Sequence, residues 1–187
     1  MKNGLFAAVA AVALLGGSAQ ATVAVIGDGQ AKVCFQLATY AKPEESALKI
    51  CREALAQDDL SKRDRAATFV NRGVIEMGLK RMAEAQDDFN KGIALMPDLG
   101  EGYLNRGAAF IGQGRFSEAL ADLDTGLKLG VSRPEIGYYD RGIANEALGN
   151  VKAAYEDYRQ ALAIEPRFER ASEQLKRFKV VDVPDGT

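Results

Sequence analysis

Two cysteines and a series of regularly spaced arginines and aspartates are the residues of this sequence whose types could do chemistry. The sequence has no histidine, so the commonest general base and metal ligand is absent. Acids that are adjacent in sequence, such as Asp87 and Asp88, point about 100° apart on a helix and cannot share a substrate. No phosphate loop, dinucleotide fingerprint or nucleophile elbow occurs. We therefore expect no catalytic residue, no metal site and no cofactor.

The arginines recur in a word, Asn/Asp-Arg-Gly, and an aspartate follows each of them sixteen residues later. A guanidinium cannot be buried without a partner, and a carboxylate can bind it through two hydrogen bonds. The constant offset therefore predicts structural ion pairs, with charges that are merely solvated as the alternative. The expected pairs are Arg72 with Asp88, Arg106 with Asp122, and Arg141 with Asp157.

The word is part of a longer repeat, which starts again at Asn71, Asn105 and Asp140, with steps of 34 and 35 residues. Each arginine has an aromatic residue three positions before it, and each word is followed by a second helical run. These runs carry Ala85, Ala119 and Ala154, with Phe89, Leu123 and Tyr158 four residues later. A period of this length is typical of a solenoid.

This pattern resembles the tetratricopeptide repeat over residues 66–168, which would form three units. The resemblance implies an all-α fold, a right-handed α-solenoid of antiparallel helix pairs. The sequence departs from the family pattern because it has no tryptophan and places arginine where leucine is usual. We expect Gly73, Gly107 and Gly142 to face the alanine of the partner helix, so that the two backbones pack closely.

The ends of the array are predicted to be a degenerate helical pair at residues 28–61 and a capping helix at 169–179, followed by a tail at 180–187. Overlaying the first pair on the next unit places Cys34 on Arg72 and Cys51 on Phe89. Because an even pair of cysteines in an exported chain is usually bridged, we expect a disulfide there. A redox-active dithiol is the weaker alternative, since the C-x-x-C spacing that lowers a thiol pKa is absent.

Residues 1–21 read as a cleaved signal peptide, with Lys2, a short apolar run and a small-x-small box ending at Ala21. The mature chain would begin at about Thr22 and be periplasmic or secreted. The alternative is a membrane anchor, but the apolar run is shorter than the roughly 20 residues a spanning helix needs. A formal charge of -2 offers no basic field for nucleic acid.

The family resemblance implies a binding scaffold, in which the first helix of each pair lines a concave groove for a peptide or protein partner. A carrier for an apolar small molecule or lipid in the same groove is the alternative. Family members that clamp a C-terminal carboxylate do so with lysine, asparagine and arginine, and only Asn105 matches that set. The expected groove residues are Val70, Val74, Met77, Leu104, Asn105, Ala108, Ile111, Tyr139 and Ile143, with Leu104 and Tyr139 partly exposed.

Overall fold

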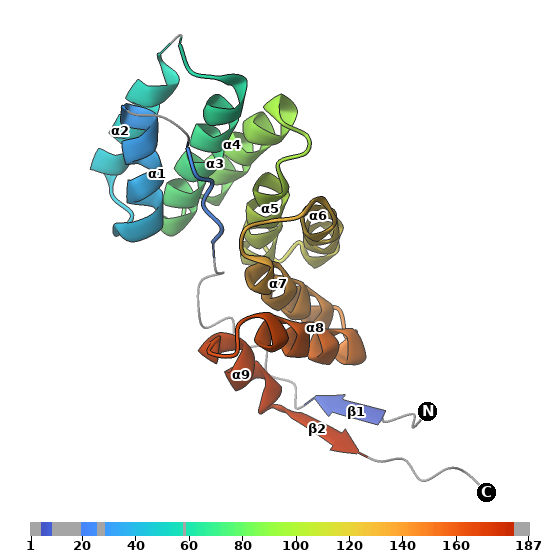
Figure 1. Ribbon diagram of the computed structural model, residues 1–187. Helices are drawn as coiled ribbons and strands as arrows, with labels where there is room; N and C mark the ends of the chain where they lie inside the picture. The colour runs from blue at the N-terminus through green and yellow to red at the C-terminus, as the bar shows by residue number, and fades with distance from the viewer. Residues whose placement is uncertain (1–4, 9–19, 26–28, 58, 182–187) are drawn as a thin grey trace, which may run out of the picture.

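The computed structural model describes residues 5–8, 20–25, 29–57 and 59–181, and its helices stack pairwise into an α-solenoid (Figure 1). Within these residues, four antiparallel pairs follow one another. They are α1 (Gln30–Tyr40) with α2 (Glu45–Leu55), α3 (Lys62–Gly78) with α4 (Met82–Leu95), α5 (Gly100–Gly112) with α6 (Phe116–Leu129), and α7 (Pro134–Ala147) with α8 (Val151–Ile164). The last three pairs are the repeat units expected from the sequence.

Helix starts and inner turns follow local sequence signals. The Ser61 hydroxyl caps α3 by accepting from the backbone N–H of Asp64, and Pro134 stands in the first turn of α7. The turn inside each repeat unit contains one left-handed residue, with φ of 67° at Lys80, 74° at Gly114 and 79° at Gly149. Two of the three units therefore use glycine where a side chain would be strained.

The repeated glycines allow close helix packing, but against a different residue from the one expected. A Cβ atom at Gly73 would lie 2.5 Å from the ring of Phe89, and one at Gly142 would lie 2.6 Å from the ring of Tyr158. A Cβ atom at Gly107 would lie 2.8 Å from Leu123 and 3.3 Å from the backbone oxygen of Ala119. The large residue four positions after the alanine fills the space beside the glycine, because its side chain reaches across the interface between the helices.

The N-terminal pair is joined by a disulfide between Cys34 on α1 and Cys51 on α2, with the Cα atoms 5.0 Å apart. Both cysteines are buried in a cluster with Ala47, Leu48 and Ile75. The cystine thus takes the place of the arginine and its partner helix contact in the repeat units. It links the two helices and packs them onto α3.

The C-terminal end differs from the single capping helix expected over 169–179. Helix α9 covers only Glu169–Leu175, and the chain then extends into β2 (Phe178–Val181), which pairs antiparallel with β1 (Leu5–Ala8). Phe178 leaves the helical register because its ring packs against Tyr155 and Tyr158, at centroid distances of 5.7 and 5.9 Å.

The structure describes the predicted signal peptide only at residues 5–8 and 20–21, and its residues 1–4 and 9–19 lie outside the described part of the chain. In the part that the structure describes, none of the helices has both the length and the apolar character needed to cross a membrane.

Reducing the disulfide should loosen the N-terminal pair before the repeat units, because units of a solenoid are coupled only to their neighbours. The bridge spans a sequence separation of 17 residues, and closing such a loop contributes about 3 kcal/mol in the chain-entropy model. We expect hydrogen exchange to accelerate in α1 and α2 on reduction while α5 to α8 keep their protection. Uniform acceleration along the chain would contradict this expectation.

Candidate functional site

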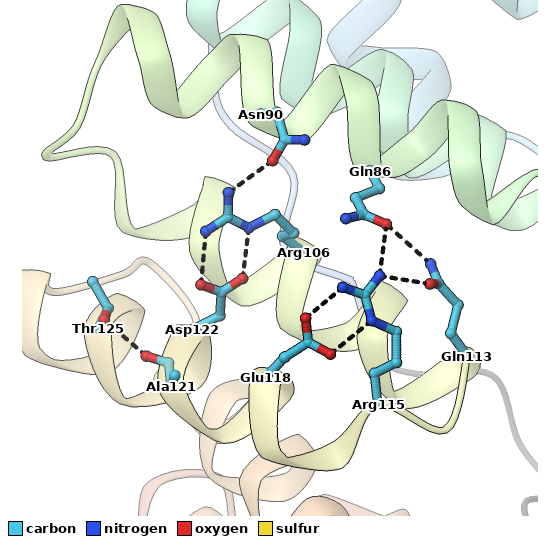
Figure 2. A network of polar contacts seen from close by, with 9 residues as sticks. All are labelled: Gln86, Asn90, Arg106, Gln113, Arg115, Glu118, Ala121, Asp122 and Thr125. Carbon is cyan, nitrogen blue, oxygen red and sulfur yellow. Dashed lines mark hydrogen bonds and ion pairs between the residues drawn. The ribbon is translucent and has the colours of Figure 1, made fainter.

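The arginine of each repeat word binds the aspartate sixteen residues later within its own unit. Arg106 donates from Nε to Asp122 Oδ2 at 2.6 Å and from Nη2 to Asp122 Oδ1 at 2.8 Å (Figure 2). Arg72 forms the same bidentate pair with Asp88, with Nε 2.7 Å from Oδ2 and Nη2 2.5 Å from Oδ1. The third pair, Arg141 with Asp157, has Nε at 3.1 Å and Nη2 at 2.6 Å from Asp157 Oδ1. All six side chains are mostly buried.

The same guanidinium groups also hold their surroundings together. Arg106 lies 5.6 Å from the ring centroid of Tyr103, and the two other arginines are placed likewise over Phe69 and Tyr138. Arg106 and Arg141 each reach back to α4 or α6 of the preceding unit, binding Asn90 and Asp124, both at 2.7 Å. The hydrogen bonds that Arg106 donates to Asp122 raise the pKa of Arg106, although burial opposes the shift. These charges are structural ties between helices.

Removing Asp122 and removing Arg106 from their ion pair should have unequal effects on stability. Asp122→Leu leaves a permanently charged guanidinium without its carboxylate and should lower stability by about 2 kcal/mol, less than for a fully buried pair. Arg106→Leu should be tolerated better, since leucine is the residue the repeat family usually places there. Thermal unfolding of both variants checks this. Glu118→Leu, which breaks the more exposed pair with Arg115, is the matched control and should change stability little.

The inner side of the helix pairs holds an extended stretch of the chain itself, residues 20–25, which we call the N-terminal segment (Figure 1). The Asn71 amide on α3 accepts from the Val23 N–H and donates to the Val23 carbonyl, both at 2.8 Å. The Asn105 amide on α5 does the same for Ala21, at 3.1 and 2.6 Å. Each asparagine therefore binds both backbone groups of one residue.

Side chains of the N-terminal segment are buried between the helices. Val23 packs in a cluster with Val70, Val74, Met77 and Ala108, and Ala21 packs with Leu104 and Ile111. The intervening Thr22 hydroxyl accepts from Thr39 of α1 at 2.9 Å. Alternate residues thus point into the helices, as in any extended strand.

Most of the groove residues expected from the sequence come together here, but they are not exposed. Leu104 and Tyr139 are both buried, contrary to the partial exposure expected. Leu104 shares a cluster with Ala21 and packs against Gly126 of α6 and Gly137 of α7. Tyr139 belongs to the next cluster with Tyr158 and Phe168, as Ile143 partly does. The expectation failed because Leu104 packs against α6 and α7, and Tyr139 packs against Phe168 next to α9, and the periodicity of a single helix does not reveal such contacts.

Sequence reasoning did not select Asn71, although its signal was present. Asn71 opens the same Asn-Arg-Gly word as Asn105, and equivalent positions in a solenoid face the same side. Asn71, Asn105 and Asp140 are therefore equivalent, and we call them the groove register residues. Their exposed fractions are 0%, 1% and 1%.

The third groove register residue differs from the other two in charge and in hydrogen bonding. Asp140 Oδ1, on α7, is buried and has no hydrogen-bond partner among the described residues. Burial raises the pKa of Asp140 well above its usual value, while the charge of Arg170 on α9 acts in the opposite direction. A buried carboxyl group without a hydrogen bond on one oxygen is costly to the fold.

Replacing Asp140 by asparagine should therefore stabilise the protein, in a pH-dependent way. A carboxyl group whose pKa is raised by folding binds more protons in the folded state, so its contribution to stability falls as pH rises above the unfolded pKa. We expect Asp140→Asn to melt at a higher temperature than the parent at pH 7, and the gap to narrow toward pH 3.5. A gap that widens on acidification would contradict the assigned burial of the charge.

Comparison with known proteins agrees with the arrangement of helices. A sequence profile described as tetratricopeptide repeat matches residues 137–168. The tetratricopeptide domain of Arabidopsis OM64 is similar at 26% identity and a TM-score of 0.59, over 63% of this chain and 96% of that one. The first tetratricopeptide domain of Spaghetti (RPAP3), bound to the HSP90 peptide SRMEEVD, is 26% identical with a TM-score of 0.56, over 59% and 89%.

A broader overlap of fold comes from MamA, whose crystal structure has a TM-score of 0.63 at 19% identity and covers 80% of this chain and 82% of its own. The search of curated proteins gives no match.

Proposed function

Since the chain is a tetratricopeptide-repeat protein, we propose that it is a non-enzymatic scaffold that binds an extended peptide of a protein partner in its inner groove. The observation that carries this proposal is the N-terminal segment, held by two asparagine side chains through its backbone. A groove that accommodates one extended strand of the chain has the hydrogen-bonding groups and the side-chain space to accept another of similar shape.

Backbone recognition determines what the groove can select. Each asparagine amide offers one acceptor and one donor to the N–H and C=O of a single residue, whatever its side chain. Selectivity then depends on the buried spaces occupied by Ala21 and Val23, which suit a small and a β-branched side chain two residues apart. This mode differs from a C-terminal carboxylate clamp, for which Val70, Val74, Ile136 and Asp140 are the wrong residue types.

The alternative, a carrier for an apolar small molecule or lipid, has less support. Asn71 and Asn105 lie in the middle of the groove and would lose four hydrogen bonds to an apolar ligand. A separate pocket of about 380 Å³ lies between the last two repeat units, but Asp124, Arg141, Glu156 and Asp157 line it. Charged walls of this kind do not suit a lipid tail.

Binding can be tested once the N-terminal segment has been displaced from the groove. Ala21→Asp with Val23→Asp in the full chain places two carboxylates where the structure buries apolar side chains, so the segment should leave. We expect this release variant to bind a labelled peptide with the sequence of residues 19–25, acetylated and amidated at its ends, more tightly than the parent does. Fluorescence anisotropy gives both affinities.

Adding Asn105→Ala to the release variant should weaken binding about tenfold or more, because two backbone groups of the peptide lose their partner. Lys152→Ala, an exposed change on α8, serves as the control and should leave affinity unchanged. Circular dichroism of each variant verifies that the helices remain. Equal affinity with and without the Asn105 amide would refute binding at this groove.

We also propose that the protein works in the cell envelope, after cleavage of residues 1–21. The small-x-small box before Thr22 and the Cys34–Cys51 disulfide support export to an oxidising compartment. The expected cut falls between Ala21, which is bound to Asn105, and Val23, which is bound to Asn71, in a buried stretch, so it would have to occur before the chain folds. The mature chain would keep Val23 for Asn71 and would leave the Asn105 amide available to a ligand. An intact mass beginning at Thr22 would support this proposal.

A further inference from the structure

The N-terminal segment runs along the groove in a fixed direction. Val23 is bound at α3 and Ala21 at α5, so the chain toward its amino end leads from the first repeat unit to the second. The next repeat unit in that direction is the third, where Asp140 on α7 occupies the equivalent position. A ligand that follows the same path therefore presents the residue two before its small side chain to Asp140.

Aspartate at this position is not what the fold alone would favour. Asparagine stands at both other groove register positions and binds an N–H and a C=O of the same residue. An ionised carboxylate can only accept, so it cannot serve the carbonyl of a passing backbone. It is also buried, with Oδ1 unpartnered among the described residues. A buried carboxyl group with an unpartnered oxygen in a ligand groove is a mark of a binding role, because a cationic ligand would stabilise its ionised form.

Asp140 also differs from the other buried atom that lacks a hydrogen bond. Glu76 Oε2 has the guanidinium of Arg81 at 3.5 Å, so its charge is paired even without a hydrogen bond. For Asp140 no ion pair within that range is found among the described residues, and the charge of Arg170 lowers its pKa less than burial raises it. The unmet requirement at Asp140 is for a donor group that carries positive charge.

We propose that Asp140 binds the free amino-terminal ammonium of an extended peptide ligand, two residues before the small side chain that faces Asn105. This inference rests on the proposed function and adds a terminus to the ligand. The ammonium supplies up to three donors and a charge at the point where the backbone ends, and it has no preceding carbonyl that would need a donor from the protein. The groove would then recognise three alternate positions of the ligand. The first residue carries the free ammonium at Asp140, the third has a small side chain at Asn105, and the fifth has a β-branched side chain at Asn71.

The full-chain release variant and the peptide with the sequence of residues 19–25 provide the test, because the peptide begins two residues before Ala21. With a free amine it should bind about tenfold more tightly than its acetylated form. Asp140→Asn in the release variant should remove that preference without weakening the acetylated peptide. Asp124→Asn, which removes a mostly exposed carboxylate from α6, is the control for loss of charge and should keep the preference.

Two further peptides separate the source of the positive charge. One is acetylated and carries lysine in place of its first residue, and the other has a free amine on a chain longer by one residue. Both should bind like the acetylated parent, because neither places an ammonium at the backbone position next to Asp140. Tight binding of either one, or a free-amine preference that survives Asp140→Asn, would overturn the proposal. If binding depends on Asn105 but not on the amine, the proposed function stands and this inference falls.

Discussion

A guanidinium placed between two helices must find a carboxylate, and this requirement organises every repeat unit. Once Arg106 turns toward Asp122 on the partner helix, the residue before it points about 100° away along the helix surface, which is toward the groove. The residue after it, Gly107, leaves space for Leu123. The three residues of the repeated word therefore have different roles. The first side chain faces the groove, the second forms an ion pair with the partner helix, and the third, a glycine, permits close packing.

This division of roles explains how the first position can vary while the fold stays the same. The arginine and glycine contact only residues of the scaffold, so a change from asparagine to aspartate at position 140 leaves the packing of α7 on α8 in place. The cost of the buried carboxyl group is local. In the N-terminal pair a disulfide replaces the ion pair, and there is no groove register residue for it to orient.

The fold could be predicted because its signals repeat. Helix pairs, the ion pairs of Arg72 and Arg141 and the bridged cysteines all follow from spacing, since an offset that recurs in three units reflects the same geometry each time. The contact of the groove with the N-terminal segment could not be predicted, because an irregular stretch has no period and Asn105 and Ala21 are 84 residues apart in sequence. The end of α9 was missed for a similar reason: aromatic packing of Phe178 overrode the local helical pattern.

The two residues of the N-terminal segment that bind Asn105 and Asn71 are two positions apart, and this spacing relates repeat units to ligand residues. Neighbouring repeat units bind residues 21 and 23, so each unit corresponds to a dipeptide, a rise of about 7 Å in an extended chain. A strand with a single residue inserted between these points is out of phase, and all its side chains beyond the insertion turn to the opposite face. Each added helix pair would therefore extend the bound ligand sequence by two residues, so the number of repeat units sets the length of peptide that the groove recognises.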